Sequence, residues 1–309
     1  MELTWIWIPI SMFAALMQAV RTAAQKTLNQ SMSTMGTTYV RSLFGMPTLV
    51  VFLGAALLYT GHGIPQYNPV FLLHTAVAAL TQVLATALLI YMFRLKNFAI
   101  GTMLTKTDVI MTALIGTALF SEQLTQTGWI ALVVVVCGSI LMLLGKIGTA
   151  AFRESGETFS SLLLGRPTQV ALMCAFLFTL SYLFLRDATR DLGEQHHFIW
   201  RAGWTVVLAT GLQTIVLGCW LAMKEPVVFR QMWKMRGIAS FIGLTSGLGS
   251  IGWYSAFALQ NASYVRAVGQ IEAVFTMLIS WLYFREKITA LELLGIGITL
   301  AGVLMFRLL

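Results

Sequence analysis

Residues 103–124 read MLTKTDVIMTALIGTALFSEQL, and the rest of the chain is best interpreted outward from this stretch. One aspartate, Asp108, stands inside a run of largely apolar side chains. If the run crosses a bilayer, an unpaired carboxylate there costs several kcal/mol. Asp108 is then a helix-packing partner, part of a misread loop, or part of a working site. The composition of the whole chain tells whether its surroundings are hydrocarbon.

The composition is that of an integral membrane protein. Of the 309 residues, 58% are hydrophobic and only 10% are charged, whereas soluble domains carry about 25% charged residues. The net charge of +8 comes from basic residues scattered at the ends of apolar runs, which favours anchoring at the membrane edge over nucleic-acid binding. The cysteines have neither metal-site nor redox spacing, so no metal and no cofactor is expected.

The chain contains ten apolar runs close to the length of about 20 residues that a spanning helix needs. They cover 4–27, 36–58, 70–93, 98–119, 126–145, 168–187, 198–222, 236–258, 264–283 and 289–308. The first run is too long for a signal peptide and is expected to be a retained helix. A polar linker, 147–167, separates a first domain, 1–146, from a second, 168–309.

An internal repeat relates the two halves. Sliding the second half on the first by 164 positions aligns the chain without a gap from residue 90 onward, with the pairs Asp108/Glu272, Thr112/Thr276, Glu122/Glu286 and Gly138/Gly302 among the matches. Because each copy has five helices, an odd number, the second copy must enter the membrane from the opposite side. The predicted fold is all-α and integral to the membrane, with ten transmembrane helices arranged as two inverted five-helix repeats.

Loop charges agree with this inversion, because Lys and Arg favour the cytoplasmic side. The loops after the second and fourth helices hold neither residue, whereas their counterparts hold Lys224, Arg230, Lys234, Arg285 and Lys287. After the third helix the bias reverses. Summed along the chain, the charges place the odd-numbered loops and the linker in the cytoplasm and both termini outside. We expect a multi-pass protein of the inner, or cell, membrane.

The repeated segments resemble the EamA-type domain of the drug/metabolite transporter superfamily. In that family a helix ends in an acidic residue followed by Leu/Ile-Thr, and the next helix carries a glycine near its middle. This chain has Glu122-Gln-Leu-Thr and Glu286-Lys-Ile-Thr, followed by Gly138 and Gly302. The resemblance implies ten helices, two inverted halves and alternating-access transport, often export of amino acids or other small metabolites.

The strongest candidate site residues are the two acids of the repeat. Asp108 and Thr112 share a helix face, as do Glu272 and Thr276. Inverted repeats tend to build their substrate site at the midplane, where both acids are expected. Lys106 lies on roughly the opposite side of its helix from Asp108 and is a further candidate. The alternative is that both acids only hydrogen-bond to neighbouring helices.

The first helix carries a polar stripe that cannot face lipid. Its members are Ser11, Gln18, Arg21 and Gln25, and the stripe either lines an aqueous cavity or packs on another polar helix. Arg21 is the candidate for holding a substrate carboxylate, because a guanidinium can grip it with two hydrogen bonds. Further candidate lining residues, each of which could simply be packing, are Gln82, Tyr91, Trp253, Tyr254 and Gln270.

Other polar residues are interpreted as structural. Arg41 and Arg201 lie near helix ends and are expected to snorkel to the interface. Glu122 and Glu286 should stabilise the helices that follow them, with Thr289 and Glu292 at capping-box spacing. His196 and His197 lack companion ligands and should be solvated. Gly243 and Gly247 are spaced as a close-packing helix face.

These observations favour a secondary transporter, and no motif of an enzyme or an ATP-driven pump is present. The main hypothesis is export of a small polar metabolite, an amino acid or other carboxylate, with possible proton coupling through Asp108. Partners would be the bilayer and a small-molecule substrate, with the chain a monomer or homodimer. One rival is an anion exchanger for sugar phosphates or nucleotide sugars. Another is a non-transporting scaffold or a subunit that helps flip a lipid.

Overall fold

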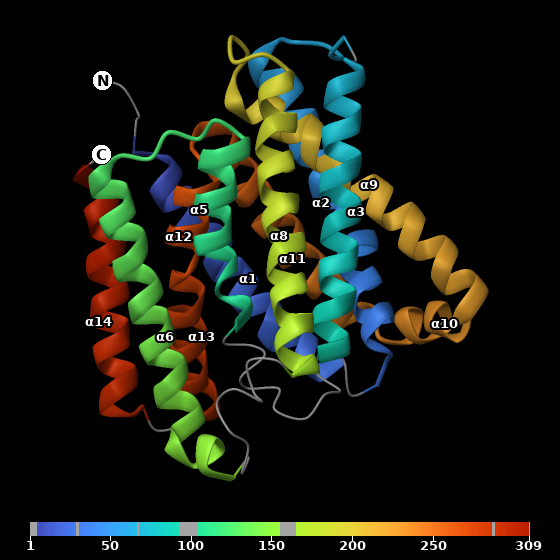
Figure 1. Cartoon of the computed structure of the whole chain (residues 1–309). Helices are drawn as coiled ribbons and strands as arrows, with labels where there is room; N and C mark the ends of the chain where they lie inside the picture. The colour runs from blue at the N-terminus through green and yellow to red at the C-terminus, as the bar shows by residue number, and fades with distance from the viewer. Residues whose placement is uncertain are drawn as a thin grey trace. The chain divides into compact units, whose positions relative to one another are not determined.

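The computed structural model describes residues 5–28, 31–66, 68–92, 104–154, 165–285 and 288–308. Every regular element in these ranges is a helix, which confirms the all-α prediction (Figure 1). The long elements are α1 (Trp7–Leu28), α2 (Thr34–Thr60), α3 (Pro69–Met92), α5 (Asp108–Leu119), α6 (Gln126–Glu154), α8 (Arg166–Asp191), α9 (Phe198–Lys224), α11 (Arg236–Leu259), α13 (Ile271–Phe284) and α14 (Ala290–Met305). Two short helices, α10 (Val227–Lys234) and α12 (Ala262–Gly269), and a 3-10 turn at Phe306–Leu308 complete them.

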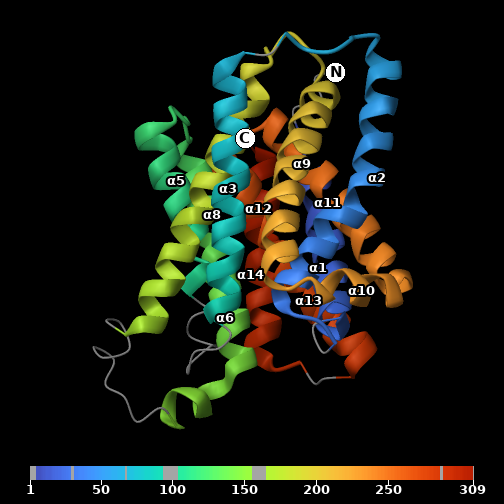
Figure 2. The ribbon, with the colours of Figure 1, turned by 90° about the vertical axis from the view of Figure 1, so that its right-hand side faces the viewer.

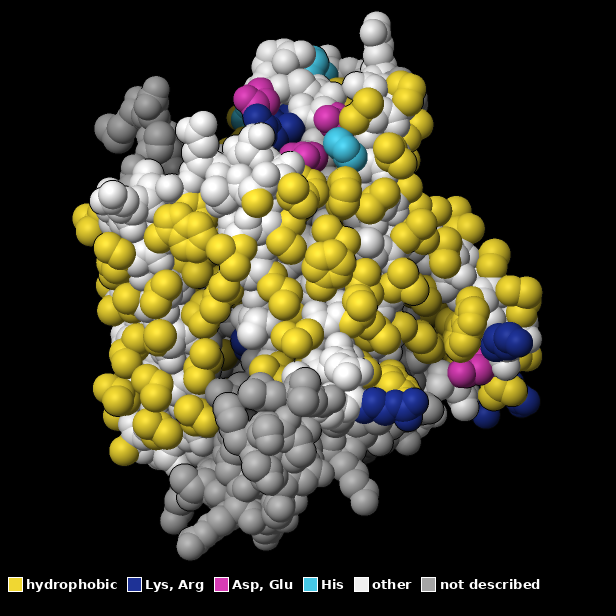
Figure 3. Space-filling model, viewed as in Figure 1, with side chains coloured by type: hydrophobic (Ala, Val, Ile, Leu, Met, Phe, Trp, Pro, Cys, Tyr) yellow, Lys and Arg dark blue, Asp and Glu magenta, His cyan; other side chains and the backbone are white. Residues whose placement is uncertain are grey.

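Several of these helices can cross a membrane. Within the described residues, six are long and apolar enough: α2, α3, α6, α8, α9 and α14. Of the other four predicted runs, three overlap α1, α11 and the pair α12–α13. The run 98–119 contains α5 in its second half, and its residues 98–103 lie outside the described part of the chain. Large apolar side chains such as Leu58, at 89% exposed, and Leu119, at 76%, face outward and require lipid around them. Hydrophobic side chains cover the helices on the face seen in Figure 3, and Lys and Arg side chains gather at α10.

The chain divides into two compact units, and neither is one half of the sequence. Unit 1 comprises Met1–Leu80 and Phe184–Gln260, and unit 2 comprises Thr81–Leu183 and Asn261–Leu309. Each unit therefore takes helices from both repeats. Unit 1 contains α1, α2, α9, α10 and α11, unit 2 contains α5, α6, α12, α13 and α14, and α3 and α8 contribute to both.

In unit 1, α11 packs against α2 through its glycines. Both helices are labelled in Figure 2. A Cβ built on Gly243 would lie 2.5 Å from the carbonyl oxygen of Phe44, and one on Gly247 would lie 2.8 Å from the Cβ of Thr48. Such contacts leave no space for a side chain. The predicted close-packing face of Gly243 and Gly247 is therefore confirmed.

The second helices of the two repeats, α2 and α9, also pack together in unit 1, and they run in opposite directions. Tyr39, near the start of α2, reaches Gly218 near the end of α9, with its hydroxyl 2.8 Å from a Cβ built on that glycine. Trp200, at the start of α9, donates to the carbonyl of Gly63 just beyond the end of α2 at 3.0 Å. This antiparallel pairing agrees with an inverted repeat.

The fifth helices, α6 and α14, form the corresponding pair in unit 2, where Figure 1 shows them side by side. Gly138 of α6 faces Thr299 of α14, and Gly302 of α14 faces Val135 of α6. Val135 and Thr299 are themselves related by the repeat shift, so one contact occurs twice. This pair is antiparallel too, because residue numbers rise along α6 as they fall along α14.

The ninth predicted span is interrupted, which the hydropathy pattern did not indicate. Instead of one helix over 264–283, α12 ends at Gly269, Gln270 follows it, and α13 begins at Ile271. The amide of Ala273 donates to the carbonyl of Gln270 at 3.0 Å, a bond one residue shorter than the α-helical one. The fourth span shows the same feature at the repeat-related position, where Val109 N donates to Lys106 O at 3.5 Å.

Candidate functional site

Asp108 is the first residue of α5, and it is buried, with 4% of its surface exposed. Its Oδ2 accepts a hydrogen bond from Nη2 of Arg266 on α12 at 2.7 Å. Arg266 is 8% exposed. A buried pair of opposite charges avoids most of the cost that each would carry alone in a low-dielectric interior. The aspartate in the fourth span is therefore neutralised by an arginine from the ninth.

An aromatic ring and a second acid complete the surroundings of Arg266. Its guanidinium carbon lies 4.2 Å from the ring centroid of Tyr182 on α8, which is cation–π geometry. Glu272, in the first turn of α13, lies within electrostatic reach of the same arginine. Arg266 therefore interacts with two carboxylates and one π face.

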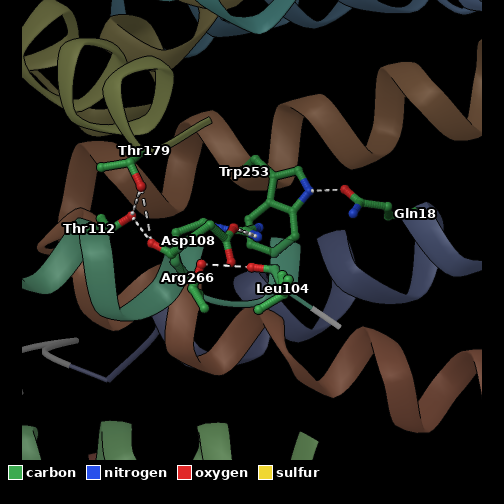
Figure 4. Close-up of polar contacts among 8 residues, drawn as sticks. Gln18, Leu104, Asp108, Thr112, Thr179, Trp253 and Arg266 are labelled. Atoms are coloured by element: carbon green, nitrogen blue, oxygen red, sulfur yellow. Dashed lines mark hydrogen bonds and ion pairs between the residues drawn. The ribbon is translucent and has the colours of Figure 1, made fainter. Parts of the chain in front are cut away.

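Two threonines hold the backbone at the start of α5 (Figure 4). The carbonyl oxygen of Asp108 accepts from the hydroxyl of Thr112 at 2.6 Å and from that of Thr179 on α8 at 3.1 Å. The two hydroxyls lie 3.2 Å apart, within hydrogen-bonding distance of each other. This network ties α5 to α8 beside the ion pair, so Thr112 contributes through the backbone of Asp108.

Glu122 holds α12, the helix that carries Arg266. Its side chain is 1% exposed. Oε1 accepts from the amide of Ala262 at 2.6 Å, and Oε2 accepts from the amide of Ser263 at 3.3 Å and from the Ser263 hydroxyl. An acid at a helix N-terminus satisfies free amides and the positive end of the dipole. The structural interpretation of Glu122 is confirmed, but the helix it caps is α12 rather than α6, which follows it.

A family model matches the sequence over nearly the whole chain. The model is described as the EamA-like transporter family, and it matches residues 5–144 and 167–308. The chain belongs to the EamA-like transporter family. It is therefore a multi-pass membrane transporter, and the family is not one of enzymes.

A solved structure supports the same fold for this EamA-like chain. It is described as "Crystal structure of protein" and is 16% identical in sequence, with a TM-score of 0.71 over 98% of this chain and 96% of that chain. At that identity the likeness speaks for the fold alone. No curated protein matches the sequence.

Among the other predicted site residues of unit 2, Gln270 is the most buried, at 1% exposed, and it caps the C-terminal end of α12. Lys106, Glu272 and Thr276 are half-buried. On α3, Gln82 is half-buried, whereas Tyr91 is exposed. The structure thus brings Asp108 and Glu272 to Arg266, places Thr112 on the backbone of Asp108, and leaves Tyr91 exposed.

The remaining predicted site residues belong to unit 1. Trp253 Nε1 donates to Gln18 Oε1 at 3.0 Å, so two of them meet directly (Figure 4). Arg21 and Gln25 are half-buried on α1, as expected of a stripe that avoids lipid, and Tyr254 is buried. Their role in substrate binding stays a prediction.

Two expectations for unit 1 are wrong. Arg201 does not snorkel: it is 7% exposed, and it donates to the carbonyls of Ala258 at 3.0 Å and Thr189 at 3.4 Å, near the C-terminal ends of α11 and α8. Helix C-termini attract cations, which explains a buried arginine there. His196 is not simply solvated either, because its ring packs 4.8 Å from those of His62 and Trp200, centroid to centroid.

Sequence reasoning missed Arg266, Tyr182 and Thr179 as site residues. Arg266 stood out only as a cation inside a predicted span, six residues before Glu272. Tyr182 and Thr179 lie on α8 and have no charge to attract notice. The usable signal was charge balance, because a buried Asp108 requires a cation from another helix.

Proposed function

We propose that this chain is a secondary transporter that exports a small polar metabolite, an amino acid or another carboxylate, across the inner membrane by alternating access. The observation that carries the proposal is the buried Asp108–Arg266 pair beside two interrupted helices. Interrupted helices are a recurring way to build a substrate site inside a membrane, because their ends present dipoles and free backbone groups.

The ion pair supplies a contact that a substrate can replace. A substrate carboxylate presents the same two oxygens as Asp108, so it can compete for the Arg266 guanidinium. A proton on Asp108 would likewise release Arg266, which would couple the site to a pH gradient. In this mechanism Tyr182 keeps the arginine in place while its carboxylate partner changes.

The rival anion exchanger needs a surplus of cations at its site. Among the described residues, the electrostatic partners of Arg266 include both Asp108 and Glu272, so its guanidinium is already matched by carboxylates. The amino acid or carboxylate hypothesis accounts for this balance better than a phosphate ester does.

Reconstitution in liposomes tests the proposal. Efflux of a panel of amino acids and hydroxy acids should be saturable, and Arg266→Gln should abolish it. Arg230→Gln, at an exposed arginine of α10, is the matched control and should leave efflux intact. Absence of flux for every solute would favour a scaffold, and counter-transport of labelled phosphate esters in place of these solutes would favour the exchanger.

A further inference from the structure

In unit 2, two buried oxygens of carboxylate or amide groups have no hydrogen-bond donor among the described residues. One is Oδ1 of Asp108, the carboxylate oxygen that Arg266 does not use. The other is Oε1 of Gln270. Both side chains are more than nine-tenths buried. Buried polar atoms are nearly always paired in folded proteins, so each of these oxygens calls for a donor.

The two oxygens lie in the same region of unit 2, beside Arg266. Gln270 follows Arg266 by four residues, so both side chains lie on the same face of α12, one turn apart. Arg266 contacts Asp108, and α12 packs against α5. The amide of Gln270 therefore lies along the helix face that meets the aspartate.

The usual partner for a carboxylate beside an arginine is the guanidinium itself, through two parallel bonds. Here the guanidinium lies over the Tyr182 ring and bonds only one of the two carboxylate oxygens of Asp108. The second oxygen is left for another donor. Two acceptor oxygens without a donor favour a ligand that brings N–H groups to them.

A cationic donor fits these two acceptor oxygens. Gln270 is the C-cap of α12, and the C-terminal end of a helix carries partial negative charge. Asp108 and Glu272 act on the single guanidinium of Arg266, and Lys106, two residues before Asp108, is the other charged side chain of this stretch. A primary ammonium has three donors and no acceptor, which suits two acceptor oxygens beside a helix C-terminus.

We propose that Asp108 Oδ1 and Gln270 Oε1 form a subsite for the protonated amine of the transported solute. The inference rests on the transport function proposed above and deepens it, because it separates amine-bearing solutes from simple carboxylates. The carboxylate of a zwitterion would engage Arg266 while its ammonium engages these two oxygens. Gln270 thereby becomes a specificity residue at the interruption of the ninth span.

The test uses matched solutes that differ in the amine or in the carboxylate. Leucine, phenylalanine, glutamate and lysine are each compared with the acid that lacks the α-amine and the amine that lacks the carboxylate. Binding to the purified full chain is measured by titration calorimetry, and flux is measured separately in liposomes. At least one amine-bearing solute should bind roughly 10- to 100-fold more tightly than its amine-free counterpart, the range expected for a charged hydrogen bond.

Substitutions then test whether Gln270 causes the preference for amine-bearing solutes. Gln270→Leu keeps the volume and removes the acceptor, so it should erase the amine preference, whereas Gln270→Glu should strengthen it. Gln213→Leu is the control, because Gln213 is a buried glutamine of α9 that bonds the Ala79 carbonyl in unit 1. The control should keep the preference. These variants avoid Asp108, whose replacement also breaks the ion pair.

The outcomes are separable. Equal binding of amine-bearing and amine-free solutes, a preference that survives Gln270→Leu, or binding of none of the solutes overturns the subsite. Binding of sodium ions, instead of amines, that depends on Gln270 would overturn it too. If amine-bearing solutes bind more tightly but no solute is transported, the subsite is upheld and the transport function is rejected. If solutes are transported equally well with and without the amine, transport is upheld and the subsite is rejected.

Discussion

Asp108 and Arg266 depend on each other, because either charge alone would be buried without a partner. Asp108→Asn or Arg266→Gln should each lower the free energy of unfolding by about 3–5 kcal/mol. The double variant should recover much of that loss, since it removes both charges. Thermal unfolding in detergent measures the stability of the two single variants and the double variant. If the losses of stability of the single variants add up in the double variant, the pairing is contradicted. Normal stability of the Asp108→Asn variant would contradict it as well.

Glu122 is a second residue whose effect depends on burial. Glu122→Gln replaces one acceptor oxygen by a donor at the start of α12, so it should cost about 1–3 kcal/mol for a buried amide left unsatisfied. Exchange of the Ala262 and Ser263 amides with solvent should accelerate. Glu194→Gln is the control: this glutamate pairs with Arg190 at the surface, where loss of a pair costs at most about 1 kcal/mol. Equal effects of the two variants would remove the capping role.

Among the elements, the α6–α14 pair offers a clean comparison between two glycines of one helix. A Cβ on Gly295 would lie 2.6 Å from the amide nitrogen of Met142 and 2.7 Å from the carbonyl oxygen of Gly138, whereas one on Gly297 meets nothing within 4 Å. Gly295→Ala should therefore force the helices apart and lower the unfolding free energy by about 1–3 kcal/mol. Gly297→Ala should be neutral or stabilise by up to about 1 kcal/mol. The unfolding midpoints of the two variants check this, and the opposite order would reject the packing.

The interruption at Gln270 shows why element boundaries were harder to predict than element positions. Residues 264–283 are apolar enough to be taken for one span, and Gln270 and Glu272 were noted as single polar residues within it. A change from α-helical to shorter hydrogen bonds leaves no mark in hydropathy. The repeat would have helped, because Lys106 and Gln270 occupy equivalent positions and both stand where the helix changes.

For the whole molecule, the inverted repeat predicts where equivalent loops face. Gln66, after the second span, and Lys234, after the seventh, are exposed and lie in corresponding connections between spans. In a background without Cys137, Cys174 and Cys219, Gln66→Cys should react with an impermeant maleimide from outside intact cells. Lys234→Cys should react only after the cells are permeabilised. Labelling of both from one side would contradict the inversion, and exchange of the two results would reverse the orientation.

Local properties of the chain were enough to identify the membrane class, the approximate positions of the spans and the repeat. Apolar run length and residue spacing are visible within a window of about 20 residues, and they persist whatever the neighbours are. The same holds for the capping box at Thr289 and Glu292, a local motif that is confirmed. Asp108 was singled out in this way, because a carboxylate within an apolar run is conspicuous wherever it packs.

Packing between distant segments determined the partners. Asp108 meets an arginine 158 residues further along the chain, and Glu122 caps a helix that begins 140 residues after it. No local pattern encodes such distances, since many polar residues could have met once the helices assembled. The choice depends on which faces pack, and that is governed by the close approaches at glycines and the need to satisfy every buried charge.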